Sequence, residues 1–338
     1  MNQKVKTKIA VVGAGAIGSV LGGLLAHAGE DVTLISRKAH IDAINKNGLF
    51  MDGVLGELKI KVKATEKLNF KPDLVLLPVK TQDVKKACEE IKPYVKDIPT
   101  LTMQNGVRSD EIASSVFGKE NIISCVVNFG AIFLEPGKVT YRRKGFLITG
   151  EAFSKNRERV NEIALILNKA KYIKTEISNN IHGAHWTKLL GNLIVNCQAA
   201  MTGLTLGECG EYSILRKIVV MILREAFQVI EKAGINLEPL PTVRPSLFRT
   251  IAKLPLPLSS LVIRILSRRF GKAPGSTLQS ILRGKPTEID YLNGEIVRLG
   301  KKIGIPTPYN SKVVELVHEV EKTHKFYSPD DLKKIFKW

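Results

Sequence analysis

One stretch near the start of the chain decides the fold of its first half: residues 8–18 read KIAVVGAGAIG. Residues 8–12 are typical of a buried strand, residues 19–26 of a helix and residues 31–37 of the next strand. In a GxGxxG turn between strand and helix, the first glycine makes the tight turn and the second lets the backbone approach a pyrophosphate. The third lets the helix pack on the strand. The free N–H groups at the helix start then attract the phosphates. We therefore expect a dinucleotide site at Gly13, Ala14, Gly15, Ala16, Ile17 and Gly18. The alternative is a glycine turn in some other α/β protein.

The end of the second predicted strand indicates which dinucleotide binds. An acidic residue at this position would bond the ribose hydroxyls of NAD, but the chain has Ser36-Arg37-Lys38. A cation here suits the 2′-phosphate of NADP, and no carboxylate repels it. We interpret Arg37 as the 2′-phosphate ligand and NADPH/NADP as the cofactor. The alternative is that both cations belong to an ordinary basic surface.

Strands and helices go on alternating after this unit, which predicts a doubly wound, mainly parallel sheet. Ligands of such sheets lie at the carboxyl ends of the strands. Lys80 follows the apolar run 72–79, and Asn105 follows the run 99–103. Both are therefore expected beside the cofactor, although Lys80 alone could be a surface lysine and Asn105 alone a turn residue. An antiparallel meander with a turn at 135–138 is predicted within residues 121–150.

From Asn179 onward the pattern is helical. The fold class is α/β, with a Rossmann-type domain over residues 1–178 and an all-helical domain over residues 179–338. The Pro-rich segment 237–275 is predicted to interrupt the helices, and its basic amphipathic part 261–270 could face a membrane or acidic partner or cover a core. We favour a covering surface helix. Residues 284–294 are predicted to open another helix, with Pro286 in its first turn, and a last long helix is expected to end at Thr323.

A polar stripe in the second half indicates what the protein binds. Lys188, Asn192 and Asn196 are spaced four residues apart in an otherwise apolar stretch, so a helix places them on one face. Buried amides and ammonium groups need partners. A small anionic ligand rich in oxygen could supply them all. The alternative is a solvated polar face.

The composition excludes several classes. An apolar fraction of 44% and a charged fraction of 25% are those of a soluble globular protein. The net charge of +19 invites a nucleic-acid interpretation, but the cations are spread along the chain without an aromatic-basic module. Four cysteines without metal-ligand spacing fit a reduced cytoplasmic protein. Neither a signal peptide nor a membrane span is expected, nor is a metal.

Together these motifs resemble those of the ketopantoate reductase (2-dehydropantoate 2-reductase) family over nearly the whole chain. The matching marks are the glycine motif, Arg37, residues 78–80, 104–106 and 186–196, and Ser276 followed twelve residues later by Glu288. The resemblance implies a cleft in which Lys188 and Glu288 are catalytic and Lys80 and Asn105 lie by the cofactor. It implies that the substrate is held by Asn105, Lys188, Asn192, Asn196 and Ser276.

The implied reaction is the NADPH-dependent reduction of ketopantoate to (R)-pantoate in pantothenate and coenzyme A biosynthesis. Hydride transfer to a ketone carbon leaves negative charge on oxygen, which an ammonium can stabilise and protonate. The chain departs from the family pattern at Ala273, at Ser280 and in its longer Pro-rich segment. Reduction of another branched 2-oxo acid, an opine-type dehydrogenase and a non-enzymatic NADP sensor therefore stay open, as does a homodimer.

Overall fold

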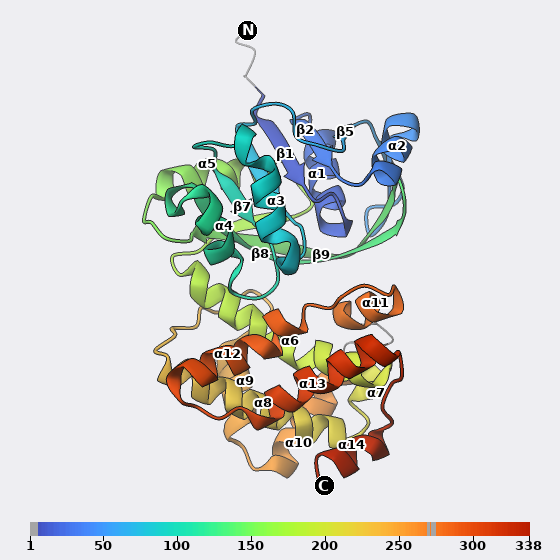
Figure 1. Ribbon diagram of the computed structural model, residues 1–338, viewed down its shortest axis with the longest axis vertical. Coiled ribbons are helices and arrows are strands. Elements are labelled where there is room, and N and C mark those ends of the chain that lie inside the picture. The colour runs from blue at the N-terminus through green and yellow to red at the C-terminus, as the bar shows by residue number, and fades with distance from the viewer. Residues whose placement is uncertain (1–5, 269–270, 272–274) are drawn as a thin grey trace. The chain divides into compact units, whose positions relative to one another are not determined.

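The computed structural model describes residues 6–268, 271 and 275–338 (Figure 1). The chain divides into two compact units, Met1–His182 and Gly183–Trp338. The predicted domain boundary, between residues 178 and 179, precedes helix α6, whereas this division passes through the first turn of that helix. Ala273 and Phe270, which entered the sequence interpretation, lie outside the described residues.

The first unit is built on one ten-stranded mixed sheet. Its strands are β1 (Lys8–Val12), β2 (Asp31–Ile35), β3 (Leu49–Gly53), β4 (Leu58–Ile60), β5 (Lys63–Thr65), β6 (Leu74–Leu77), β7 (Thr100–Thr102), β8 (Ile122–Glu135), β9 (Lys138–Glu151) and β10 (Lys174–Ile177). The strand order is β4-β3-β9-β8-β7-β6-β1-β2-β5, and β10 pairs with β9. Strands β5, β2, β1, β6, β7 and β8 pair in parallel, while β8–β9 and β3–β4 are antiparallel.

Helices cover both faces of this sheet. They are α1 (Ala16–His27), α2 (Lys38–Asn47), α3 (Val84–Ile91), α4 (Ser109–Phe117) and α5 (Arg157–Asn168). Strand β1 shows the two-sided burial: Ile9 and Val11 belong to the core that includes α1 and α5, and Ala10 and Val12 to the core that includes α3 and α4. Because successive side chains of a strand point to opposite faces, a strand buried on both faces is apolar throughout. The predicted doubly wound sheet and the hairpin turn at 135–138 are confirmed.

The described part of the second unit is built from helices. They are α6 (Ile181–Thr202), α7 (Leu206–Cys209), α8 (Ser213–Lys232), α9 (Pro245–Lys253), α10 (Leu256–Ser267), α11 (Ser276–Leu282), α12 (Asn293–Ile303), α13 (Pro308–Thr323) and α14 (Pro329–Ile335). Helix α8 packs against α9, α10, α12, α13 and α14, and a run of its apolar side chains is fully buried. None of the helices in the described part of the chain combines the length and apolar character that a membrane span needs.

The interruption predicted over residues 237–275 is wrong, because α9 and α10 lie within it. Pro245 is the first residue of α9, and Pro257 lies in the first turn of α10. A proline there loses no hydrogen bond, since the first N–H groups of a helix have no partner within it. These prolines therefore begin helices rather than prevent them. The expected covering surface helix corresponds to α10, whose described residues include the buried Ser259, Ile263 and Ser267.

The helix predicted to open within residues 284–294 is present as α12, but the predicted start, with Pro286 in the first turn, is wrong. A short 3₁₀ turn at Ile289–Tyr291 precedes α12, which begins only at Asn293. The hydroxyl oxygen of Thr287 accepts from the Ile289 N–H (3.2 Å), and the Thr287 N–H donates to Glu321 Oε1 on α13 (2.6 Å). This contact with a distant helix holds the segment in a turn, so Pro286 does not start a helix. Helix α13 ends at Thr323 as predicted, but α14 follows it.

Candidate functional site

The glycine-rich loop between β1 and α1 is tied to the end of β2. The N–H groups of Gly13 and Ala14 both donate to the Ile35 carbonyl, at 3.0 and 2.9 Å. Because β1 pairs with β2 in parallel, both strands end at the same edge of the sheet. The loop therefore lies beside the segment that carries Arg37.

The three glycines of this loop have different surroundings. Gly13 has φ +103° and a Cβ there would overlap Val79, while a Cβ on Gly18 would lie 2.6 Å from the Gly13 carbonyl oxygen and 2.8 Å from Pro78 Cγ. The fold itself therefore requires both. A Cβ on Gly15 would meet nothing within 4 Å. Open space above a backbone at a helix start is what close approach of a phosphate needs.

The two cations after β2 are not equivalent. Lys38 Nζ is paired with Asp42 Oδ2 at 3.0 Å, one turn along α2. Arg37 is exposed and has no ion pair or side-chain hydrogen bond within residues 6–268, 271 and 275–338. Its guanidinium is thus the one of the two whose donors are available to an anionic ligand.

Lys80 and Asn105 lie in loops that the structure holds together. Strands β6 and β7 are parallel neighbours, with β1 on the other side of β6. Thr81 Oγ1 donates to the Asn105 carbonyl oxygen (2.9 Å), and Gln104 Nε2 donates to the carbonyl oxygens of Leu77 and Val79 (3.1 Å for the latter). The predicted cofactor residues thus follow four adjacent strands at one sheet edge. Sequence reasoning did not assign the bridging role of Gln104, whose place in the Gln-Asn-Gly turn was the signal for it.

In the second unit, α6 places the polar stripe as predicted. It is a continuous helix from Ile181 to Thr202, so Lys188, Asn192 and Asn196 follow one another at successive turns. Lys188 and Asn192 are half-buried, and Asn196 is buried. The Asn192 Nδ2 atom is buried and has no hydrogen-bond partner among the residues that the structure describes. Most buried polar groups of native proteins are hydrogen-bonded, so this donor is one that a ligand oxygen could satisfy.

Asn196 and Ser276 are brought together from positions 80 residues apart. Ser276 Oγ at the start of α11 donates to Asn196 Oδ1 at 2.9 Å. The carboxamide oxygen of Asn196 is thus engaged, and its NH₂ group is the part that can donate to a ligand. Glu288 is half-buried and precedes the 3₁₀ turn before α12. These residues and Lys188 belong to the second unit, while the glycine loop, Arg37, Lys80 and Asn105 belong to the first.

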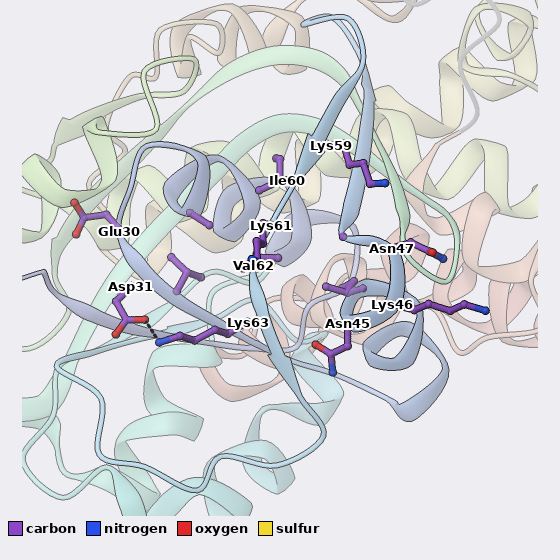
Figure 2. Close-up of a pocket in the computed structure, with 14 residues that line it drawn as sticks. Glu30, Asp31, Asn45, Lys46, Asn47, Lys59, Ile60, Lys61, Val62 and Lys63 are labelled. Atoms are coloured by element: carbon purple, nitrogen blue, oxygen red, sulfur yellow. Dashed lines mark hydrogen bonds and ion pairs between the residues drawn. The ribbon is translucent and has the colours of Figure 1, made fainter.

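A pocket of about 730 Å³ lies elsewhere in the first unit (Figure 2). It is lined by the end of α1, the start of β2, the end of α2 and the β4–β5 segment, and includes none of the predicted site residues. Asp31, which lines the pocket, is the first residue of β2, whereas the glycine loop lies beside the last residue of β2. The pocket is therefore at the opposite end of the parallel strands from the glycine loop. Lys63 Nζ is paired there with Asp31 (2.7 Å). Exposed lysines on the outer strands β4 and β5 discourage unwanted strand pairing, which accounts for this basic character.

No group of three or more His, Cys, Asp or Glu side chains is arranged to hold a metal ion within the described part of the chain. The four cysteines have free, buried thiols. Burial raises the pKa of Cys88, Cys197 and Cys209 to about 12, so these groups stay protonated and unreactive near neutral pH.

Comparison with known families assigns the chain. The family model described as ketopantoate reductase PanE/ApbA matches residues 9–153, and the model of its C-terminal domain matches residues 180–321. A 2-dehydropantoate 2-reductase of Pyrococcus horikoshii is 35% identical over 93% of this chain and 97% of its own. A reductase of the same name from Aquifex aeolicus is 27% identical over 93% and 97%.

Solved structures agree with this assignment. A PanE/ApbA family ketopantoate reductase from Ralstonia eutropha has a TM-score of 0.78 and 31% identity, covering 93% of this chain and 98% of its own. A D-mandelate dehydrogenase solved with NADH and anilino(oxo)acetate has a TM-score of 0.81 and 26% identity over 93% and 98%. Fold and sequence thus define an oxidoreductase with a dinucleotide-binding type of fold. The chain belongs to the ketopantoate reductase family.

Proposed function

We propose that the chain catalyses the NADPH-dependent reduction of ketopantoate to (R)-pantoate, a step of pantothenate and coenzyme A biosynthesis. Its family membership and the name shared by its relatives support this reaction. The cytoplasm is the proposed compartment, and four buried free thiols are consistent with a reducing environment there.

The cofactor belongs on the edge formed by the glycine loop. The free N–H groups at the start of α1 receive the pyrophosphate, and the open space over Gly15 admits it. Arg37 receives the 2′-phosphate, since its guanidinium is exposed and has no partner among the described residues. A guanidinium matches a phosphate with two charge-assisted hydrogen bonds. Lys80 and Asn105 complete the cofactor side.

The observation that carries the substrate assignment is the unsatisfied Asn192 Nδ2 on the Lys188 face of α6. The oxygens of a 2-oxo acid can accept from this amide and from the Asn196–Ser276 pair. When bound, NADPH would supply a hydride to the ketone carbon. The Lys188 ammonium then stabilises the developing negative oxygen and gives it a proton, which leaves a hydroxyl group. Glu288 is proposed as the second catalytic group and Asn105 as a further substrate ligand.

The test is a rate comparison with purified protein, in which loss of NADPH absorbance is followed with three acids. Ketopantoate is expected to have the highest kcat/KM. The matched control is 2-oxoisovalerate, a branched 2-oxo acid that lacks the terminal hydroxymethyl group of ketopantoate. Equal turnover of the two would contradict the assignment of ketopantoate while retaining a 2-oxo acid reductase.

A second candidate substrate class is an aromatic 2-oxo acid, because the D-mandelate dehydrogenase has a TM-score of 0.81 with this chain. Phenylglyoxylate is therefore the third acid of the panel. Preferential turnover of phenylglyoxylate would replace the proposal with this second candidate. An absence of turnover with all three acids, in protein that binds NADPH, would favour a dinucleotide sensor.

A further inference from the structure

His40 is a buried histidine to which the proposed reaction gives no role. It lies on α2, one turn after Arg37, and is 3% exposed. Its ring lies against Phe133 of β8, with the ring centroids 4.8 Å apart. Its two ring nitrogens contact Ser19 of α1 and Gly137 in the β8–β9 turn. One side chain thus links three elements that are far apart in the sequence.

The directions of these hydrogen bonds follow from their chemistry. The Gly137 N–H can only donate, and it reaches His40 Nδ1 at 2.9 Å, so Nδ1 carries no proton. The proton of the neutral ring is then on Nε2, which donates to Ser19 Oγ at 3.0 Å. The Ser19 hydroxyl in turn donates to the Ala14 carbonyl oxygen at 3.0 Å. Burial lowers the pKa of His40, which is consistent with a neutral ring.

This chain of hydrogen bonds ends on the glycine-rich loop. Because a peptide unit is planar, holding the Ala14 carbonyl oxygen also sets the orientation of the Ala14–Gly15 peptide. That peptide leads directly into the first turn of α1, whose N–H groups are the proposed phosphate ligands. The His40 backbone N–H also donates to the Arg37 carbonyl oxygen at 3.0 Å. His40 therefore bonds to the loop through Ser19 and to the segment that carries Arg37.

We propose that His40, acting through Ser19, is a positioning residue that holds the glycine-rich loop in the conformation that binds the pyrophosphate of the dinucleotide. The inference rests on the proposed role of that loop in cofactor binding. A residue that orders the loop contributes to NADPH and NADH binding equally, since both have the pyrophosphate. This separates it from Arg37, which would act on NADPH alone.

The experiment measures Kd for NADPH and NADH by fluorescence titration, with thermal unfolding in parallel. His40→Phe keeps an aromatic ring against Phe133 but removes both hydrogen bonds. It is expected to raise Kd for both nucleotides about three- to tenfold, the effect of a typical net hydrogen bond. kcat at saturating NADPH and KM for ketopantoate are expected to stay near wild-type values. A purely structural role would lower thermal stability without this selective loss of cofactor affinity.

Two amide variants test the two hydrogen bonds of the His40 ring separately. His40→Gln carries an amide that can still donate to Ser19, and His40→Asn carries an oxygen that can still accept from Gly137. Because only the Ser19 branch reaches the loop, His40→Gln is expected to keep more affinity than His40→Asn. Ser19→Ala should raise Kd as much as His40→Phe does. The double variant should bind no worse than either single variant, because both substitutions interrupt the same series of hydrogen bonds. If His40→Phe does not fold, the Ser19→Ala, His40→Gln and His40→Asn comparison decides.

Two further variants calibrate the result. His27→Gln, at an exposed histidine on α1, is the control and is expected to bind both nucleotides normally. Gly15→Ala tests the proposed cofactor site itself. Normal NADPH binding by Gly15→Ala would remove the loop from the cofactor site. If Gly15→Ala weakens binding, two results would overturn the His40 inference alone. One is a wild-type Kd in the His40 and Ser19 variants, and the other is additive losses of affinity in the double variant.

Discussion

Three glycines in one loop illustrate how the surroundings of a residue decide its role. Gly13 and Gly18 are surrounded so closely that a methyl group would meet Val79 or the backbone. Gly15 lies between them with open space. A residue type alone therefore does not separate glycines that the fold needs from a glycine whose surroundings would admit a side chain.

This difference predicts opposite effects for two alanine substitutions. Gly15→Ala should leave the thermal midpoint unchanged but weaken NADPH binding about tenfold, because the methyl group fills the space of the pyrophosphate. Gly18→Ala should lower the thermal midpoint, since its methyl group would lie 2.6 Å from the Gly13 carbonyl oxygen. Differential scanning fluorimetry and NADPH titration measure both quantities. A destabilised Gly15→Ala would contradict the open surroundings.

Arg37 and Lys38 allow a test with adjacent cations of equal charge. Arg37→Ala is expected to weaken NADPH binding about ten- to a hundredfold, the range for losing a charged hydrogen bond, and to leave NADH binding nearly unchanged. Lys38→Ala is the control, because its ammonium is already paired with Asp42. The measurement is the Kd of each variant for NADPH and for NADH. Equal losses in the two variants would mean a general electrostatic effect rather than a 2′-phosphate ligand.

At the scale of the element, helix α6 combines two demands on one sequence. Leu189, Leu190 and Leu193 are buried and anchor the helix, while Lys188 and Asn192 occupy half-buried positions of another face. A buried amide without a partner costs stability, and Asn192 Nδ2 has none among the described residues, so we infer that it is kept for a ligand. The helix is therefore less stable than an apolar one would be, but it presents polar groups at successive turns of one face.

Asn192→Leu tests this inference. The thermal midpoint should stay equal or rise, since an unsatisfied buried donor is replaced by an apolar group of similar size. KM for ketopantoate should rise about tenfold or more if the amide binds the substrate. Asn310→Leu is the matched control: Asn310 Nδ2 donates to Glu225 Oε2 (2.7 Å) and Oδ1 accepts from Asn293 Nδ2 (3.0 Å). It should lose about 1–3 kcal/mol of stability. A destabilised Asn192→Leu with normal KM would make Asn192 structural.

Lys188→Ala should act on kcat, because the ammonium is needed most when negative charge develops on the ketone oxygen. The expected decrease is roughly a hundred- to ten-thousandfold at saturating substrate and cofactor, the range for a positioned acid. The Kd for NADPH should change little. Lys217→Ala is the control and should keep normal kcat, because Lys217 is half-buried like Lys188 but its ammonium lies over the Trp338 ring. Near-normal kcat in Lys188→Ala would remove the lysine from the mechanism.

At the scale of the whole molecule, the net charge of +19 gives anionic ligands a favourable field and makes the folded chain sensitive to acid. Added protons increase a positive charge that already repels itself. The buried ring of His40 adds a specific contribution to this general one. Its lowered pKa means that the folded state binds a proton less readily than the unfolded chain, whose histidine titrates near its ordinary value of 6.5.

The sign of the resulting pH effect is defined. Between the lowered pKa and 6.5 the unfolded chain holds a proton at His40 and the folded chain does not, so the free energy of unfolding falls as the pH falls through this window. His40→Gln should reduce this acid slope of wild-type protein, by at most about 1.4 kcal/mol per pH unit. Urea unfolding followed by circular dichroism measures it, with His27→Gln as control. Identical slopes in wild type and His40→Gln would exclude the effect.

Much of this protein could be predicted from sequence because the deciding signals are local. The βαβ unit, the loop of Gly13–Gly18 and the turn at 135–138 each depend on residues close together in the chain. The face shared by Lys188, Asn192 and Asn196 follows from helical periodicity alone. The ketopantoate reductase family was likewise recognisable from short motifs in order, and the comparisons confirm it.

The failures have a common cause in contacts between distant segments. The prolines of 237–275 suggested an interruption, yet Pro245 starts a helix that packs on α8. Pro286 suggested the first turn of a helix, yet the Thr287 N–H donates to Glu321 of α13, and the helix begins only at Asn293. Propensity sets what a segment prefers alone, and tertiary contacts of about the same energy can reverse that preference.

The sequence by itself thus determined the class of fold, the glycine-rich loop and the polar face of α6, since each is encoded by local spacing. Only the tertiary structure decided which of these side chains already have partners. It paired Lys38, while Arg37 and Asn192 Nδ2 have no partner among the described residues. It also joined Asn196 to Ser276 and connected His40 to the glycine loop. A hydrogen bond across 80 residues depends on where the chain returns, and local periodicity contains no record of that.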